Sequence, residues 1–269
     1  MITVRDPAVA GLFYPAEASA LERAVSDLLA GPPSVARSPQ ALIVPHAGYD
    51  YSGPVAASAY RCLQARSEPI RRVLLVGPSH RSVFGGFVVP RADAFRTPLG
   101  DVAVDTDLRA RAIARDDVLE KDPPHRFEHS LEVQLPFLQL VLDDVSVLPV
   151  LVGFATGDEC ATLIDALWTE PDTLLVVSSD LSHEHDEATA RRLDMATAEA
   201  IERREPQRVD EDDACGCIGI QGLLRVAIDR GLQIERVDLR TSADTMGSPA
   251  RVVGYGAFVV FDPDGDDVT

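Results

Sequence analysis

The sequence contains almost no lysine. Lys121 is the only lysine among 25 basic residues, and 43 acidic residues give the 269-residue chain a net charge of −18. A surface this acidic repels phosphate backbones and anionic lipids. We therefore expect neither nucleic acid nor a membrane among the partners of this protein.

Other familiar signals are also absent. No apolar run reaches the roughly 18 residues that a membrane span requires, and the first residues lack the basic and apolar regions of a signal peptide. The cysteines show no disulfide-framework spacing and no Cys-x-x-Cys pair for structural zinc; they are Cys62, Cys160, Cys215 and Cys217. These absences favour a cytoplasmic protein with reduced thiols.

Nucleotide-binding and serine-hydrolase signatures are missing too. There is no Gly-x-Gly-x-x-Gly after a strand, no Gly-x-x-x-x-Gly-Lys and no Gly-x-Ser-x-Gly. The sequence therefore gives no motif-based support for a nucleotide-binding protein or a serine hydrolase.

Short apolar runs alternate with helical patterns of ten or more residues, and 46% of the residues are hydrophobic. The main predicted strands are 41–45, 72–76, 145–152 and 173–178, and the main helices are 16–29, 54–65, 156–168 and 186–205. This alternation predicts a single α/β domain over residues 1–262, with a mixed, mostly parallel sheet and helices on both faces. The acidic residues 263–269 are expected to be disordered.

Three histidines follow predicted strands at the point where each strand ends. His46 and His80 follow 41–45 and 72–76, and His183 follows 173–178. Ligands of open α/β sheets collect at the carboxyl ends of the strands, and a crossover through one helix would place His46 beside His80. Paired imidazoles suit a first-row metal, although each could instead cap a turn or bond a backbone carbonyl.

Cys215 lies in a glycine-containing turn before a predicted helix, where the helix dipole would lower the pKa of its thiol. It is either a thiolate ligand or nucleophile, or a small buried apolar residue. Cys217 is predicted to pack in the core. His183 could be a third ligand, a general acid–base group or a turn residue.

His129 and Glu132 are three residues apart at a predicted helix start, and therefore on one face. This spacing serves ligands and acid–base pairs, but also helix caps. His125, in a proline-rich loop, is assigned no role, and His185 is predicted to be a surface residue.

Several motifs together carry a resemblance to a known family. They are Ala10-Gly-Leu-Phe-Tyr-Pro15, Pro45-His-Ala-Gly-Tyr-Asp-Tyr-Ser-Gly53, Gly77-Pro-Ser-His80, Glu128-His-Ser-Leu-Glu-Val-Gln-Leu-Pro136, Ser178-Ser-Asp-Leu-Ser-His183 and Ala214-Cys-Gly216. In these motifs and their order the sequence resembles the Memo family (mediator of cell motility), whose prokaryotic members are called AmmeMemoRadiSam system protein B.

The resemblance implies a fold similar to class III extradiol (LigB-type) dioxygenases. It implies that His46, His80 and Cys215 are metal ligands and that His183 matches the acid–base histidine of those enzymes. A ligand pocket is expected to include Tyr49, His129, Glu132 and Asp180.

The implied third ligand departs from the dioxygenases, which hold iron with two histidines and a carboxylate. A thiolate is softer and oxidisable, so iron or copper is expected, with zinc as a further option, and ring cleavage is not expected. The resemblance allows a metal-dependent oxidoreductase of unknown substrate. It also allows a non-catalytic protein that binds a small molecule or peptide, or a partner of a radical-SAM enzyme and an AMMECR1-like protein.

Overall fold

The computed structural model describes residues 2–35, 37–65 and 69–263. Among these residues, a nine-stranded sheet has the order β10-β12-β2-β9-β3-β8-β4-β7, with β11 paired to β12. Its centre is parallel and consists of β2 (Ala41–Val44), β9 (Thr173–Ser178), β3 (Arg72–Pro78) and β8 (Ser146–Val152). Apart from Pro263, the predicted acidic tail lies outside the described residues.

Both flanks of the parallel centre carry antiparallel pairings. On one side β12 (Val252–Phe261) pairs with β2, β10 (His183–His185) and β11 (Gln233–Thr241). On the other, β4 (Phe87–Val89) pairs antiparallel with β8 and parallel with β7 (Val118–Glu120). A small separate sheet joins β1 (Val4–Arg5), β5 (Ala94–Thr97) and β6 (Gly100–Ala103).

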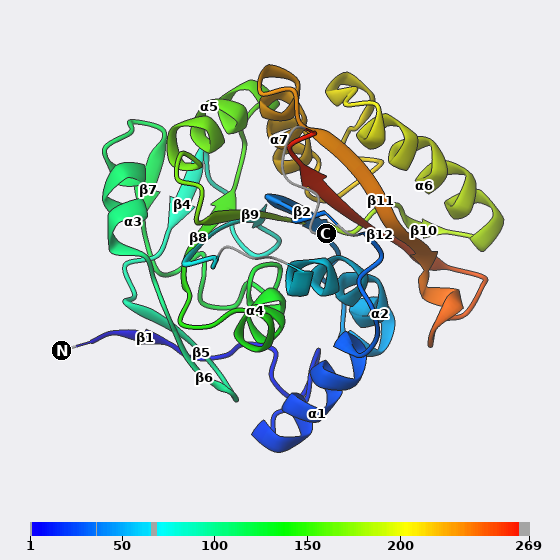
Figure 1. The fold of residues 1–269 in the computed structure, drawn as a ribbon, viewed down its shortest axis with the longest axis horizontal. Coiled ribbons are helices and arrows are strands. Elements are labelled where there is room, and N and C mark those ends of the chain that lie inside the picture. The colour runs from blue at the N-terminus through cyan, green and yellow to red at the C-terminus, as the bar shows by residue number, and fades with distance from the viewer. Residues whose placement is uncertain (1, 36, 66–68, 264–269) are drawn as a thin grey trace.

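Helices flank the main sheet (Figure 1). α5 (Gly157–Leu167), α6 (Glu187–Glu202) and α7 (Cys217–Asp229) lie over one face, and α1 (Ala18–Leu29), α2 (Tyr49–Tyr60) and α4 (Leu135–Val141) over the other, with α3 (Thr106–Ile113) near β7. The prediction of an α/β protein with a mixed, mostly parallel sheet flanked by helices is confirmed. In the described part of the chain, no helix has the length and apolar character needed to cross a bilayer.

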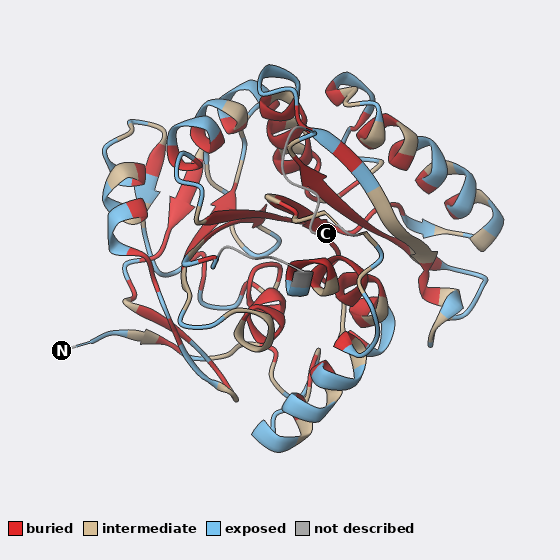
Figure 2. Ribbon diagram, in the orientation of Figure 1, coloured by how far each residue is buried: buried red, intermediate tan, exposed pale blue. Residues whose placement is uncertain are grey.

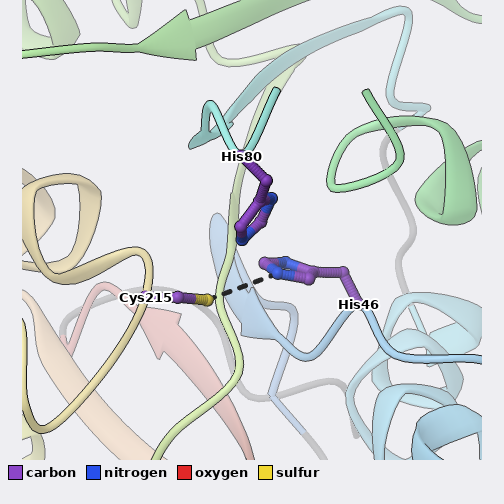
Figure 3. A group of neighbouring side chains, drawn as sticks. All are labelled: His46, His80 and Cys215. Atoms are coloured by element: carbon purple, nitrogen blue, oxygen red, sulfur yellow. Dashed lines mark hydrogen bonds between the residues drawn. The ribbon is translucent and has the colours of Figure 1, made fainter. Parts of the chain in front are cut away.

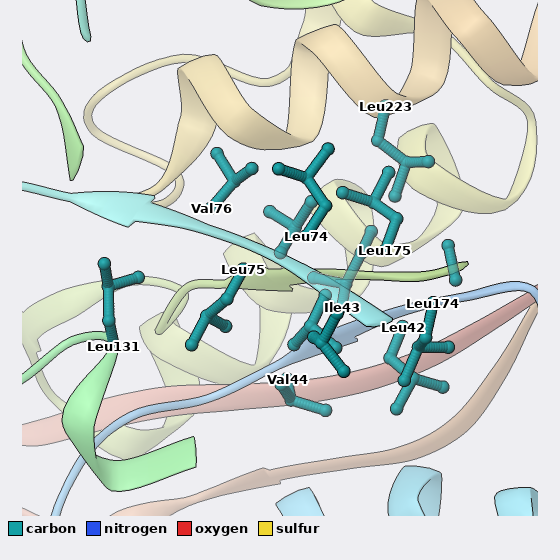
Figure 4. Packing of buried hydrophobic residues seen from close by; sticks show 14 of the residues in the cluster. Leu42, Ile43, Val44, Leu74, Leu75, Val76, Leu131, Leu174, Leu175 and Leu223 are labelled. Carbon is teal, nitrogen blue, oxygen red and sulfur yellow. The ribbon is translucent and has the colours of Figure 1, made fainter. Parts of the chain in front are cut away.

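Burial on both faces explains why the central strands are continuously apolar rather than alternating. Every residue of β2 and β9 is buried, and the helices turn their buried sides toward the sheet (Figure 2). Leu223 of α7 lies over Leu74 and Leu175 on one face, while Leu75 and Leu131 lie on the other (Figure 4). The central strands are therefore held between two layers of apolar side chains.

β9 lies between β2 and β3, but all three run parallel and end at the same edge, so His46 and His80 come together as predicted. The structure corrects one local prediction. The helix predicted over 54–65 begins at Tyr49 and contains Pro54 internally. Proline is common in the first turn of helices, so Pro54 suggested a helix start that is later than the observed one.

Glu132 fastens the N-terminal segment to the body of the protein. Its buried carboxylate pairs with Arg5 and accepts hydrogen bonds from the backbone N–H groups of Ala8 and Val9 (2.8 and 3.0 Å) and from the Tyr14 hydroxyl (2.6 Å). Arg5 also donates to the carbonyl oxygens of the loop at His125 (3.0 and 2.9 Å) and Glu128 (2.7 Å). These contacts connect the first residues of the chain to the loop before α4.

We expect Glu132→Gln to destabilise the protein by about 3 kcal/mol, the lower end of the range for breaking a buried ion pair, because Arg5 keeps its carbonyl partners. Urea denaturation measures the change. The matched exposed variant Glu22→Gln should stay within about 0.5 kcal/mol of the parent. Equal stability of the two variants would show that the pair contributes nothing.

Candidate metal centre

Three side chains from distant parts of the chain meet at the carboxyl edge of the sheet (Figure 3). His46 follows β2, His80 follows β3, and Cys215 lies just before α7. Their ligand atoms lie within 4.8 Å of one another, and the Cys215 Sγ is 3.3 Å from the His46 Nε2. The two imidazole rings have centroids 5.2 Å apart.

The donor set fits a first-row metal ion. Bonds of about 2.0 Å to imidazole nitrogen and about 2.3 Å to thiolate place two ligands of one ion roughly 3–4 Å apart. The His46–Cys215 separation already lies in that range, and the full group needs only small side-chain movements. Two imidazoles and one thiolate could therefore hold a single ion here.

Glu128 orients the imidazole of His80. Its buried carboxylate accepts from the His80 Nδ1 (3.0 Å) and from the backbone N–H of His80 (2.6 Å). It also accepts from the backbone N–H groups of His129 (2.9 Å) and Ser130 (3.0 Å), and the His129 Nδ1 lies 3.2 Å away. Burial alone would raise the pKa of Glu128, but hydrogen bonds from His129 and His80 outweigh it and hold the pKa well below its usual range.

His46 is the buried member of the group. Its backbone N–H donates to the Asp180 carboxylate (2.7 Å), and its Nδ1 lies 2.9 Å from the Ser178 hydroxyl. Burial lowers the pKa of His46 from 6.5 to about 4, against the opposing effect of Asp180. The imidazole is therefore neutral near pH 7, as a metal ligand must be.

The environment of Cys215 differs from the prediction. Burial, and then the nearby Asp180 carboxylate, raise the pKa of the thiol, so the expected lowering by a helix dipole is wrong. In addition, α7 begins at Cys217, so the thiol of Cys215 precedes the first turn of the helix. A Cβ at Gly216 would lie 2.7 Å from the Ser178 carbonyl oxygen, and this glycine therefore lets the Cys215 turn approach the end of β9.

A third imidazole adjoins the group. The His129 ring stacks on His80 with centroids 4.7 Å apart and meets His46 edge-on at 5.5 Å. His183, the predicted acid–base residue, lies instead in β10, where it is exposed and pairs with Val253 across the sheet edge. The ring beside the candidate ligands is thus that of His129.

The remaining predicted pocket residues have structural contacts. The Tyr49 hydroxyl donates to the Val133 carbonyl oxygen (2.7 Å) from a buried position, and Asp180 supports the backbone of His46. Glu132 directs both carboxylate oxygens to the N-terminal segment, so the structure places its carboxylate in that anchor rather than in the pocket that the sequence indicated. No side chain caps the short helix that contains Glu132, so its carboxylate does not serve the alternative role of a helix cap either.

Sequence reasoning missed Glu128 and Ser178, the two residues that contact the Nδ1 atoms of the candidate ligands. Both lie inside motifs that were noticed for their histidines. A carboxylate next to a histidine, and a serine at the last position of a strand, were the available signals.

A cavity of about 270 Å³ reaches Cys215 from the surface. Its wall includes Ser79, Ser82, Phe84, Phe154, Glu211 and Cys215. Cys217 also lines it and is otherwise buried in the core, as its predicted packing role requires. The cavity offers a route by which a small molecule could approach the thiol.

The fold and this group of side chains define an α/β protein with a candidate metal centre of two histidines and one cysteine. A family model described as Memo-like protein matches residues 5–259. MEMO1 family proteins of Aquifex aeolicus and Thermotoga petrophila are each 34% identical to the chain, covering 94% and 96% of it and 97% and 99% of their own lengths. The chain therefore belongs to the Memo family.

His125 provides a test of the acid sensitivity of the loop near this site. It is buried, its Nε2 bonds the Val88 carbonyl oxygen (3.2 Å), and burial lowers its pKa from 6.5 to about 3. In the unfolded chain His125 is protonated below about pH 6.5, whereas in the folded chain it stays neutral down to about pH 3. The free energy of unfolding that this difference contributes is fully present above pH 6.5. It falls as the pH drops from 6.5 to 3, by at most about 1.4 kcal/mol per pH unit.

We expect His125→Gln, whose amide can still donate to Val88, to make the fall in unfolding free energy between pH 6.5 and 3 shallower. Denaturation curves at several pH values measure the slope. The exposed-site variant His183→Gln is the control. If both variants keep the parental slope, buried His125 does not contribute to acid sensitivity.

Proposed function

We propose that this protein is a metal-dependent oxidoreductase that holds one iron or copper ion with His46, His80 and Cys215. The observation that carries the proposal is the meeting of three ligand atoms within 4.8 Å at the carboxyl edge of the sheet. Zinc is a further option for the same donors. The sheet, with a parallel centre and ligands at the strand ends, is also compatible with a relationship to LigB-type dioxygenases.

The thiolate is the feature that separates this site from ring-cleaving enzymes. Bound iron or copper would supply one-electron redox chemistry. A thiolate ligand favours softer ions than the carboxylate that helps to hold the iron of the dioxygenases. We therefore expect no cleavage of catechols. The residues of the chain contribute orientation: Glu128 holds His80, and Asp180 holds the backbone of His46.

We propose His129, in preference to the exposed His183, as the histidine that exchanges a proton with a bound molecule. Its ring adjoins both candidate histidine ligands, and its Nδ1 is 3.2 Å from Glu128. A carboxylate on one ring nitrogen fixes the orientation of the imidazole. His129 is therefore better placed than His183 to serve the site.

The cavity beside Cys215 supports a small-molecule substrate. At about 270 Å³ it lies near the lower limit of ligand pockets. Apolar Phe84 and Phe154 contribute to its lining together with the acidic Glu211, and the whole chain carries a charge of −18. These features favour a neutral, partly apolar molecule over a phosphorylated peptide. The alternative is a non-catalytic protein that binds a peptide or small ligand in this pocket, or that serves as a partner of a radical-SAM modification system.

We expect protein purified without oxygen to contain about one equivalent of iron or copper, and His80→Ala and Cys215→Ala each to lose it because a ligand is missing. Elemental analysis of the purified variants measures the metal. Cys217→Ala and His185→Ala are the matched thiol and imidazole controls, and both should retain the metal.

A parent protein that arrives metal-free and takes up no added iron, copper or zinc would refute the proposed centre. The binding-protein alternative would then be preferred. Catechol cleavage by the iron-loaded protein would instead contradict the distinction drawn from Cys215.

A further inference from the structure

Ser178, the last residue of β9, has three polar neighbours around one buried hydroxyl. Its Oγ lies 2.6 Å from the Ser130 carbonyl oxygen, 2.9 Å from the Gln134 side-chain nitrogen and 2.9 Å from the His46 Nδ1. Ser178 and Gln134 are fully buried and His46 is 2% exposed. Buried polar groups must find their hydrogen-bond partners within the protein. The donors and acceptors around Ser178 therefore determine which atom carries each proton.

The hydroxyl has only one proton to donate. The Ser130 carbonyl oxygen can only accept, and therefore receives that proton in the 2.6 Å contact. The remaining two neighbours of Oγ must then be donors. For Gln134 this is consistent with its other contacts, since the same nitrogen donates to the Pro45 carbonyl oxygen (2.9 Å) and its Oε1 accepts from the Tyr60 hydroxyl (2.9 Å).

The same reasoning places the proton of neutral His46 on Nδ1. A neutral imidazole carries one N–H and one lone pair, so the Nε2 of His46 carries the lone pair. That atom lies 3.3 Å from the Cys215 Sγ, on the side of the candidate metal. A metal-binding imidazole must be neutral, so the tautomer is the remaining variable.

We propose that Ser178 is a positioning residue that holds His46 in the Nδ1–H tautomer and so keeps Nε2 ready to bind a metal. The proposal rests on the proposed function of His46, His80 and Cys215. It gives the two histidines different supports, an anionic carboxylate for His80 and a neutral hydroxyl for His46. Partners of this kind at the second ring nitrogen orient metal-binding histidines and raise their ligand strength.

Loss of the Ser178 hydroxyl should allow the proton of His46 to move from Nδ1 to Nε2. In Ser178→Ala the Nδ1–H would face an apolar methyl group, and burial of an unpaired donor is costly. Moving the proton to Nε2 restores a partner, because the Cys215 sulfur can accept it, but this places the proton where the metal must bind. Ser178→Thr keeps a hydroxyl at the same position and is the conservative rescue variant.

The first measurement is the tautomer of His46 in metal-free protein near pH 7, by long-range proton–nitrogen NMR of histidine-labelled chain, with His46→Asn assigning the signal. We expect Nδ1–H in the parent and in Ser178→Thr, and a shift toward Nε2–H in Ser178→Ala. Ser52→Ala, which removes another buried hydroxyl that donates to the Ala47 carbonyl oxygen, should leave the signal unchanged. An Nε2–H signal in the parent overturns the proposal without any variant.

The second measurement is the affinity for Co²⁺, followed by its thiolate absorption. Ser178→Ala should bind about 10- to 100-fold more weakly than the parent, with affinity largely restored in Ser178→Thr. An unchanged tautomer and affinity in Ser178→Ala overturns the role of Ser178. A parent that shows the Nδ1–H tautomer but binds no Co²⁺ refutes the proposed function instead, and with it the purpose assigned to Ser178.

Discussion

The parallel alignment of β2, β9 and β3 is the constraint on which the candidate centre depends. Parallel strands end at one edge, so the residues that follow β2 and β3 emerge beside the end of β9. The backbone register places Val44 opposite Ser178, which brings the hydroxyl of Ser178 to the ring of His46. Insertion of β9 between the other two strands therefore supplies the site with a support between its two histidines.

Buried polar groups around the site are satisfied by two different devices. Glu128 collects N–H donors from His80, His129 and Ser130, which keeps a negative charge close to the imidazoles. Ser178 satisfies His46 without charge. Both contacts are made at Nδ1, which leaves Nε2 of His46 and of His80 for the candidate metal site. An anionic support on one side and a neutral one on the other limits the total charge that must be buried beside Cys215.

The support of the site reaches back to the start of the chain. Arg5 pairs with Glu132 and donates to the carbonyl oxygens of His125 and Glu128. The loop that presents Glu128 is therefore bound at its backbone by the N-terminal segment. Tyr14 adds a hydroxyl to the same carboxylate. Arg5 and Tyr14 near the start of the chain, together with Glu132, thus hold the loop before α4 in place.

Local pattern determined much of this protein: continuous apolar strands, a histidine after each of β2 and β3, and the ordered motifs of the Memo family. Tertiary structure decided the rest. Contacts between residues far apart in the chain determine the place of β9 in the sheet and the position of the His129 ring beside the candidate ligands. They also determine the contacts of Glu128 and Ser178 and the raised pKa of the Cys215 thiol. Hydropathy and spacing report local conformation, whereas strand order, burial and hydrogen-bond partners exist only once distant segments have packed together.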